Sequence, residues 1–532
     1  MSGTSTDGPA RQEQLSDAGV LARIWEEVLG VGPVGPDDDF FSLGGDSLLA
    51  AQVIGVAKER GLRLTLLDLF KNPTPRGTCA GSAAAAGPEA GDPEDGLLRA
   101  EDRALVPEGA EAVHPATRLQ LGLIYENLIS GGELYIDAVS RTVTLPLDVS
   151  VLRRAVDRVA RRHPVLRSRF DLTTFSEPMQ VVEREVEVPL ETADRSGPDA
   201  AEQHEKVMQT LLTPFDPEQA PLWRVHAAPV GDAAFRLSYA FHHAALDGWS
   251  ESVLSSELIR LYAGLLRGEP VELAAPAPAQ EYVRLERAAL RSEESRRHFE
   301  RLGADRGAVP PERGDGSGDP FRKVCAPIPT ADIERLRRLG ADWGLPVKSL
   351  LLAADCTAQA ALAGGSAVTV GLTVSGRPER VGSELTLGLF LNTLPLRLDV
   401  AGVSWRTAAR RAFDAENALL AHRRFPDAEV RSLLGGPPFA TVFNYVHFHA
   451  RDRLLDAGLV TADEDLRDRS SFPVRVEVID DPRGRGPLLE VTVDEARYGA
   501  GTAEKLLRYV LSALHLMAEG PDEPALAGLP HA

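Results

Sequence analysis

Two adjacent histidines at the end of an apolar, alternating segment carry the strongest chemical signal in the sequence. The stretch LSYAFHHAALDGWS contains His242 and His243, and Asp247 and Gly248 follow shortly after them. Histidine is the side chain whose protonation changes nearest neutral pH, and it is the commonest general acid or base. A single histidine on such a strand is more often a core residue. Two histidines with Asp-Gly at this spacing indicate a site that moves a proton.

The alternation of the same segment gives the two histidines different surroundings. Successive side chains of a strand point to opposite faces, so His243 continues one face and His242 lies on the other. The apolar residues on the face of His243 are Phe235, Leu237, Tyr239 and Phe241. We therefore expect the two histidines to have different roles. Gly248 permits a tight turn after Asp247, and a helix is expected from Trp249.

A serine at the start of an expected helix is the second chemical signal. In DDDFFSLGGDSLLA, the pair Gly44–Gly45 breaks the chain, Asp46 offers an N-cap, and Ser47 opens a helix that runs to about Glu59. Unpaired N–H groups and a partial positive charge at a helix start suit a phosphate ester. The simpler interpretation of an arbitrary Gly-Asp-Ser is that Asp46 or Ser47 only caps the helix.

Composition narrows the class of protein. The chain has 532 residues, 43% of them hydrophobic and 26% charged, and a formal net charge of −20. Such an acidic balance argues against nucleic acid or an anionic membrane as the main partner. The widely spaced cysteines Cys79, Cys325 and Cys356 form no metal-ligand group and are typical of free thiols in a reducing compartment. The N-terminus does not resemble a signal peptide, and no apolar run approaches the ~20 residues of a membrane helix. We expect a cytoplasmic protein.

Patterning divides the chain into several parts, with a poorly patterned region near residues 274–318 partly separating two α/β halves. The expected parts are a disordered N-terminus at 1–17, a small all-helical domain at 18–84, a linker at 85–111, and two mixed α/β lobes at 112–273 and 274–528. The linker is rich in Ala, Gly, Pro, Glu and Asp, a composition that cannot make a core.

Several motifs resemble those of two related families. The pattern of His242, His243, Asp247 and Gly248 resembles the His-His-x-x-x-Asp-Gly signature of condensation domains, which are relatives of chloramphenicol acetyltransferase. The stretches RHPVLRSRF, PFDPEQAPLWR, SGRP and GLFLNTLPLR resemble further condensation motifs in the same order. The run LGGDSLLA and the four-helix pattern around it resemble carrier domains of nonribosomal peptide synthetases. The resemblance implies an all-α four-helix carrier domain, followed by an α/β condensation domain of two chloramphenicol-acetyltransferase-like lobes in a V shape.

The carrier resemblance assigns a modification. By that resemblance Ser47 carries a covalent 4′-phosphopantetheine arm, and Asp46 helps to present the serine to a phosphopantetheinyl transferase. The carrier would then deliver an acyl or peptidyl thioester to the condensation domain, which forms an amide with the amine of an acceptor aminoacyl thioester.

The condensation resemblance assigns the other site residues. It places His243 at the reaction centre, either as a base for the attacking amine or as a group that orients the amine and stabilises the oxyanion. His242 and Gly248 belong to the motif, and the resemblance implies a buried ion pair between Asp247 and Arg377 of SGRP. Two further residues complete the expected set: Asn392, near the lobe interface, and Arg118, which is either a solvated arginine or a contact beside the acceptor tunnel. No metal is expected.

Alternative functions differ in their motifs. An epimerisation domain also follows a carrier and keeps both histidines, but SESVLSSELIRLY lacks the WRxLxxD-like continuation of epimerases, and GLFLNTLPLR has the condensation form. A heterocyclisation domain replaces the histidines with aspartates. A fragment that only docks carriers and enzymes would not need His243. The expected partners are a downstream acceptor carrier domain, the neighbouring adenylation and condensation domains of a larger synthetase, and the transferase; we expect a monomer that binds neither nucleic acid nor membrane.

Overall fold

A computed structural model describes residues 16–45, 47–81, 96–193, 200–304, 312–446, 449–479 and 486–529. Two compact units divide the chain near residue 90. Asp46 and most of the N-terminus expected to be disordered lie outside the described residues. Within the described part of the chain, no helix is both long and apolar enough to cross a membrane.

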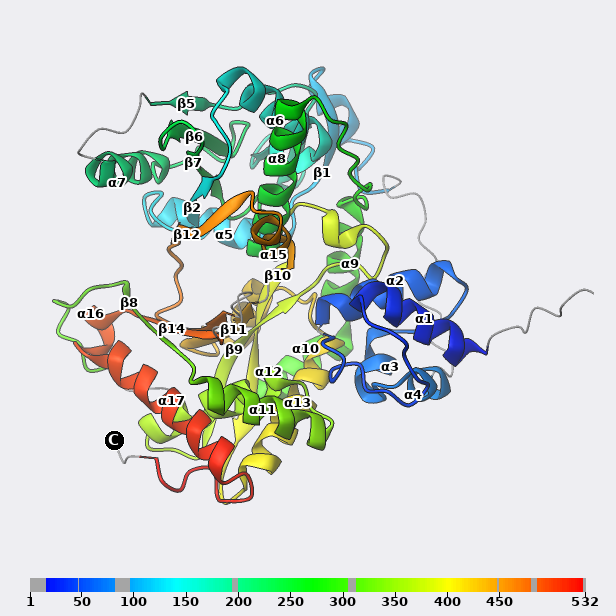
Figure 1. Ribbon diagram of the computed structural model, residues 1–532, viewed down its shortest axis with the longest axis vertical. Helices are drawn as coiled ribbons and strands as arrows, with labels where there is room; N and C mark the ends of the chain where they lie inside the picture. Colours follow the sequence, from blue (N-terminus) through cyan, green and yellow to red (C-terminus); the bar gives the residue numbers. More distant parts are fainter. Residues whose placement is uncertain are drawn as a thin grey trace, which may run out of the picture. The chain divides into compact units, whose positions relative to one another are not determined.

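The first unit is helical, as the sequence predicts (Figure 1). Its helices are α1 (Asp17–Leu29), α2 (Ser47–Glu59), α3 (Leu66–Lys71) and α4 (Pro75–Gly81). Ser16 caps α1 by accepting a hydrogen bond from the Gly19 amide, and Gly30 ends that helix in the left-handed conformation. The buried face of α1 places Trp25 edge-on against Phe40, with ring centroids 5.0 Å apart. This aromatic pair anchors the loop that leads to Ser47.

A five-stranded sheet of order β12-β2-β7-β6-β5 and a three-stranded sheet of order β1-β4-β3 form one lobe of the second unit. The strands of the larger sheet are β2 (Ile136–Val143), β5 (Leu190–Thr192), β6 (Trp223–Pro229), β7 (Phe235–His242) and β12 (Val460–Arg467). Those of the smaller sheet are β1 (Ala110–Pro115), β3 (Ser168–Asp171) and β4 (Met179–Glu183). The helices of this lobe are α5 (Arg118–Ile129), α6 (Val149–Arg162), α7 (Ala200–Leu211) and α8 (Gly248–Arg267), with 3-10 turns η1 (Asp102–Leu105) and η2 (Pro164–Arg167).

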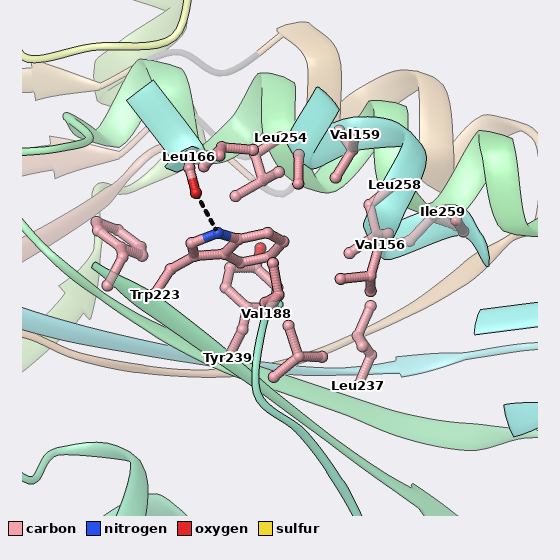
Figure 2. Close-up of a cluster of buried hydrophobic side chains, with 14 of the residues drawn as sticks. Val156, Val159, Leu166, Val188, Trp223, Leu237, Tyr239, Leu254, Leu258 and Ile259 are labelled. Carbon is pink, nitrogen blue, oxygen red and sulfur yellow. Dashed lines mark hydrogen bonds between the residues drawn. The ribbon is translucent and has the colours of Figure 1, made fainter. Parts of the chain in front are cut away.

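The core of this lobe lies between the larger sheet and helices α6 and α8 (Figure 2). The predicted alternation of β7 holds, because Phe235, Leu237, Tyr239 and Phe241 all belong to this core. The buried indole of Trp223 lies in the same cluster and donates a 3.1 Å hydrogen bond to the Leu166 carbonyl. Burying an aromatic ring while satisfying its polar atom fixes both ring and sheet. The end of β7, which carries the histidines, therefore rests on a rigid support.

A mixed six-stranded sheet of order β10-β9-β11-β13-β14-β8 forms the other lobe. Its strands are β8 (Arg322–Pro327), β9 (Ala367–Ser375), β10 (Leu391–Asp399), β11 (Thr441–Val446), β13 (Val474–Ile479) and β14 (Leu488–Val493). The remaining helices are α9 (Gln280–Leu290), α10 (Glu293–Ala304), α11 (Thr330–Trp343), α12 (Val347–Leu362), α13 (Trp405–Leu420), α14 (Asp427–Leu434), α15 (His449–Asp456), α16 (Glu495–Tyr498) and α17 (Thr502–Glu519), with the turn η3 (Ser383–Leu385). Of these, α15 packs on α8 and β12 of the first-described lobe. Helices α12, α13 and α17 pack on this sheet.

Three segments differ from the sequence expectation. Strand β12 comes from the second expected lobe but pairs antiparallel with β2 of the first, so the sheets do not follow the division at residue 273. Residues 96–111, expected to lie in the linker, pack on the domain: Leu97 is buried, and buried Asp102 accepts hydrogen bonds from Ser176. The region near 274–318, in which no helix was expected, contains α9 and α10. Most residues of these helices are charged or polar, and only a narrow stripe that includes Tyr282 and Phe299 is buried.

Candidate active site and carrier attachment site

His242 is the last residue of β7 and is fully buried. Its Nδ1 accepts a 3.0 Å hydrogen bond from the Ala244 amide, and burial lowers the pKa of this imidazole to about 4. Within the described residues, its Nε2 has no hydrogen-bond partner. A neutral imidazole enclosed in this way holds the turn after β7 but is not accessible to a substrate.

His243 has a different environment. Its side chain is 27% exposed, and its backbone amide donates a 2.8 Å hydrogen bond to the Tyr135 carbonyl. Its Nδ1 lies 2.7 Å from the Leu246 carbonyl oxygen. Because a carbonyl can only accept, Nδ1 carries the proton, and the neutral ring therefore presents an unprotonated Nε2. Within the described part of the chain, Nε2 has no hydrogen-bond partner. This nitrogen can accept a proton from a substrate.

The structure contains the ion pair between Asp247 and Arg377. Arg377 Nη2 lies 3.1 Å from Asp247 Oδ1, and both side chains are buried. Asp247 also accepts hydrogen bonds from the backbone amides of Ser250 (2.7 Å) and Phe390 (3.0 Å), so it caps α8 and holds the segment before β10. Gly248 is the first residue of α8, so the helix begins there and not at Trp249. Among the described side chains, Asp247 contacts no imidazole nitrogen; it fixes the loop that follows the histidines.

Asn392 lies on β10 and organises the chain around α14. Its Nδ2 donates to the carbonyls of Arg423 (3.1 Å) and Phe425 (2.8 Å), and its Oδ1 accepts from the Asp427 amide at 3.2 Å. A buried amide side chain that bonds to three backbone groups is a structural linker. These contacts favour a structural role for Asn392.

Arg118 opens α5, and its side chain is 58% exposed. Its backbone amide donates a 2.7 Å hydrogen bond to Glu286 Oε1, while its Nε lies 3.7 Å from Glu429 on α14. The exposed guanidinium is consistent with both interpretations of Arg118. A contact with an incoming acceptor therefore stays a prediction.

Asp137 is a site residue that sequence reasoning missed. It lies on β2 opposite Phe241, and its Oδ2 is 3.2 Å from Nδ1 of His243. Burial raises the pKa of this carboxyl to about 6, although the neighbouring His243 opposes the increase. An acidic residue within the apolar pattern YIDAVSRTV was the available signal. The sequence alone did not show which residue of β7 would face it.

Tyr135 is the second residue that was missed. It has a φ of 61°, which is uncommon for a residue with a side chain. Its amide donates to the Arg469 carbonyl at 2.8 Å, its carbonyl accepts from His243, and its hydroxyl donates to Glu126 Oε2 at 2.6 Å. Its ring lies parallel to the His243 imidazole, with centroids 6.5 Å apart. These contacts hold the unusual backbone that positions His243.

Ser47 is the first residue of α2, as the sequence predicts. Gly44 has a φ of 92°, and a Cβ on Gly45 would lie 2.3 Å from the Phe40 ring, so both glycines are needed for the approach to this helix. The first amides of a helix have no partner within it and can bind phosphate oxygens. Attachment of a 4′-phosphopantetheine group to Ser47 at this helix start stays a prediction.

Fold and site together define a class: a helical carrier unit followed by a two-lobed α/β domain with an accessible histidine. Comparison with known families agrees. The model for the phosphopantetheine attachment site matches residues 19–80, and the model for the condensation domain matches residues 110–526. The chain belongs to the condensation domain family and is a carrier–condensation didomain of the nonribosomal peptide synthetase type, with an acyltransferase-type, peptide-bond-forming domain. The carrier domain is of the kind that carries covalent 4′-phosphopantetheine. The resemblance and fold class expected from the sequence are confirmed.

The chain spans a quarter or less of the length of two similar synthetases. It is 35% identical over 528 residues to AMB antimetabolite synthetase AmbE of Pseudomonas aeruginosa, covering 95% of this chain and 25% of that protein. It is 26% identical over 553 residues to malpibaldin synthetase of Mortierella alpina, covering 95% of this chain and 10% of that protein. Among solved structures, the first condensation domain of the calcium-dependent antibiotic synthetase has a TM-score of 0.65 at 21% identity, covering 79% of this chain and 99% of that one. The last comparison shows a shared fold.

Proposed function

We propose that Ser47 is the attachment residue and that the second unit transfers the acyl or peptidyl group carried there to an acceptor amine at His243. The observation that carries this proposal is the state of His243: the Leu246 carbonyl holds Nδ1 protonated, and Nε2 remains available on a partly exposed ring. His242 is enclosed and Asp247 is held in an ion pair, so neither can take the same role.

The chemistry is an aminolysis. The arm supplies a thioester, which an amine can attack. His243 Nε2 binds the attacking amine and can receive its proton, and the rigid support behind β7 keeps this nitrogen in a fixed position. Holding the two reactants in the correct geometry lowers the activation free energy by several kcal/mol, in order of magnitude, through proximity alone.

We further propose the partners and location of the chain. The acceptor amine arrives on a downstream carrier domain, adenylation and condensation domains adjoin this didomain in a larger synthetase, and a phosphopantetheinyl transferase modifies Ser47. We propose a monomer. The free thiols of Cys79, Cys325 and Cys356 support a reducing, cytoplasmic location.

Intact-mass analysis tests the carrier half. The protein is treated with a phosphopantetheinyl transferase and coenzyme A, beside Ser47→Ala and the matched control Ser42→Ala, which changes a serine in the preceding loop. Wild type and Ser42→Ala should each gain one phosphopantetheine group, and Ser47→Ala should gain none. Modification of Ser47→Ala would reject the assignment.

Dipeptide formation tests the condensation half. The donor is loaded on Ser47 from a panel of aminoacyl coenzyme A analogues, and acceptor aminoacyl thioesters are then supplied. We expect His243→Ala to lower the rate by about 10²–10⁴-fold, the usual contribution of a general base, with an unchanged Tm. The control His515→Ala alters a histidine on the distant helix α17 and should behave as wild type. A His243→Ala variant that condenses at the wild-type rate would reject the proposed role.

A further inference from the structure

Near His243 lies a buried carboxylate that does not belong to the histidine motif. Asp137 Oδ2 is 3.2 Å from Nδ1 of His243, and Asp137 is 9% exposed. The motif carboxylate Asp247 instead pairs with Arg377, so the two aspartates have separate partners. Within the described residues, His243 is the only ion-pair partner of Asp137.

The other charges around this pair are already compensated. Asp468, which follows β12, bonds to Arg475 on β13 and lies 3.6 Å from Lys323 on β8. Glu251 on α8 pairs with Arg141 at 3.0 Å, and the Tyr239 hydroxyl also donates to it. Among the described residues, Asp137 forms no ion pair with an arginine or lysine, and Arg475 acts on it only from a greater distance. A buried carboxylate without a counter-charge is costly, and that cost falls when the neighbouring group becomes positive.

We propose that Asp137 is the positioning residue of His243: its carboxylate stabilises the imidazolium that forms when Nε2 takes the proton of the acceptor amine. This inference rests on the proposed function. Of the two roles that the sequence left open for His243, a base or a group that orients the amine, it selects the base. The contact is on the Nδ1 side of the ring, so Asp137 acts without touching the substrate. The pKa of Asp137, raised to about 6, leaves this carboxyl mainly ionised above pH 7.

The proposed reaction has three steps, and His243 gains and then returns one proton. The nitrogen of the acceptor amine attacks the carbonyl carbon of the donor thioester, and a C–N bond forms. One proton of that nitrogen passes to Nε2 of His243, and the imidazolium rests beside the Asp137 carboxylate. Nε2 then returns the proton to sulfur as the C–S bond breaks. The products are an amide and a thiol, and His243 is neutral again.

The test compares Asp137→Asn with wild type in single-turnover dipeptide formation over pH 5.5–9, with His243→Ala in parallel. Asparagine keeps the shape of the side chain but removes its charge. We expect the maximal rate to fall about 10²-fold, the lower end of the range of general-base effects, with unchanged KM for the acceptor and unchanged modification of Ser47. The acid limb of the rate profile should move to lower pH, because the imidazole no longer has an anionic neighbour. A purely structural residue would not move that limb.

The outcomes separate the inference from the proposed function. If His243→Ala is inactive while Asp137→Asn keeps both the wild-type rate and the wild-type acid limb, only the role of Asp137 is wrong. If His243→Ala is active, the proposed function fails as well. A Tm measurement checks folding, and Asp137→Ser, which places a small polar group in the same space, is the second variant if Asp137→Asn does not fold.

Discussion

Replacing Asp247 with alanine should destabilise the second unit without removing a catalytic group. The substitution leaves Arg377 buried without its counter-charge, and breaking such a pair typically costs about 3–5 kcal/mol. It also removes the cap of α8, worth about 1 kcal/mol. The Phe390 amide loses its acceptor as well. The expected loss of unfolding free energy is therefore about 4–6 kcal/mol.

Thermal unfolding measures this loss. For a unit of residues 90–378 and 382–532, an unfolding entropy of about 2.1 cal/mol/K per residue converts this loss into a fall of roughly 4–7 °C in Tm. Asp247→Asn keeps an acceptor for the cap and should lose less. The control Asp522→Ala changes a carboxylate that is 81% exposed and 3.7 Å from Arg406, and should change stability by less than about 0.5 kcal/mol.

Activity measured well below the lowered Tm completes the test. Per folded molecule, Asp247→Ala should retain most of the transfer rate, since His243 Nε2 and the Leu246 carbonyl that fixes its tautomer remain. An unchanged Tm together with abolished transfer would refute this reasoning, because it would place Asp247 in the chemistry. An unchanged Tm with full activity would show that the ion pair contributes nothing.

Three further substitutions test buried polar groups. His242→Ala should lower Tm more than His243→Ala does. Because burial lowers the pKa of His242, the unfolded chain takes up a proton on acidification more readily than the folded chain, and the free energy of unfolding of the wild type falls by about 2–3 kcal/mol between pH 6.5 and 4. Urea unfolding at several pH values should show this loss in the wild type and not in His242→Ala. Burial raises the pKa of Asp355 on α12 to about 7, so its ionisation begins to penalise folding above pH 4, and the penalty is complete above pH 7. Asp355→Asn should therefore stabilise the fold by about 2–4 kcal/mol at pH 8 and have no effect at pH 4. Equal effects at the two pH values would contradict this. Asn392→Ala should cost about 2–3 kcal/mol in urea unfolding by leaving the Arg423 and Phe425 carbonyls unbonded, without slowing transfer per folded molecule.

Local patterns predicted much of this structure. Alternation in β7 separated His242 from His243, and the Gly-Gly break before Ser47 marked the start of α2. These features depend on residues close in sequence, whose spacing directly determines which face a side chain occupies. The family motifs added the distant pairing of Asp247 with Arg377, which no local pattern contains.

Contacts between distant strands were not predictable in the same way. Asp137 meets His243 only because β2 pairs with β7 in one particular register, and β12 joins that sheet from far along the chain. A shift of one residue would have turned Asp137 to the other face of the sheet. Helices α9 and α10 were missed because Gly and Pro surround them and their buried stripes are narrow.

A reactive arm on Ser47 tests the central claim most directly. The protein is modified with a bromoacetyl analogue of pantetheine, whose electrophilic carbon occupies the place of the acyl group and needs no correct amino acid side chain. Peptide mass spectrometry then locates the alkylated residue. The account predicts a cross-link from Ser47 to Nε2 of His243, absent from Ser47→Ala and His243→Ala. Alkylation that avoids His243 in the wild-type protein would contradict it.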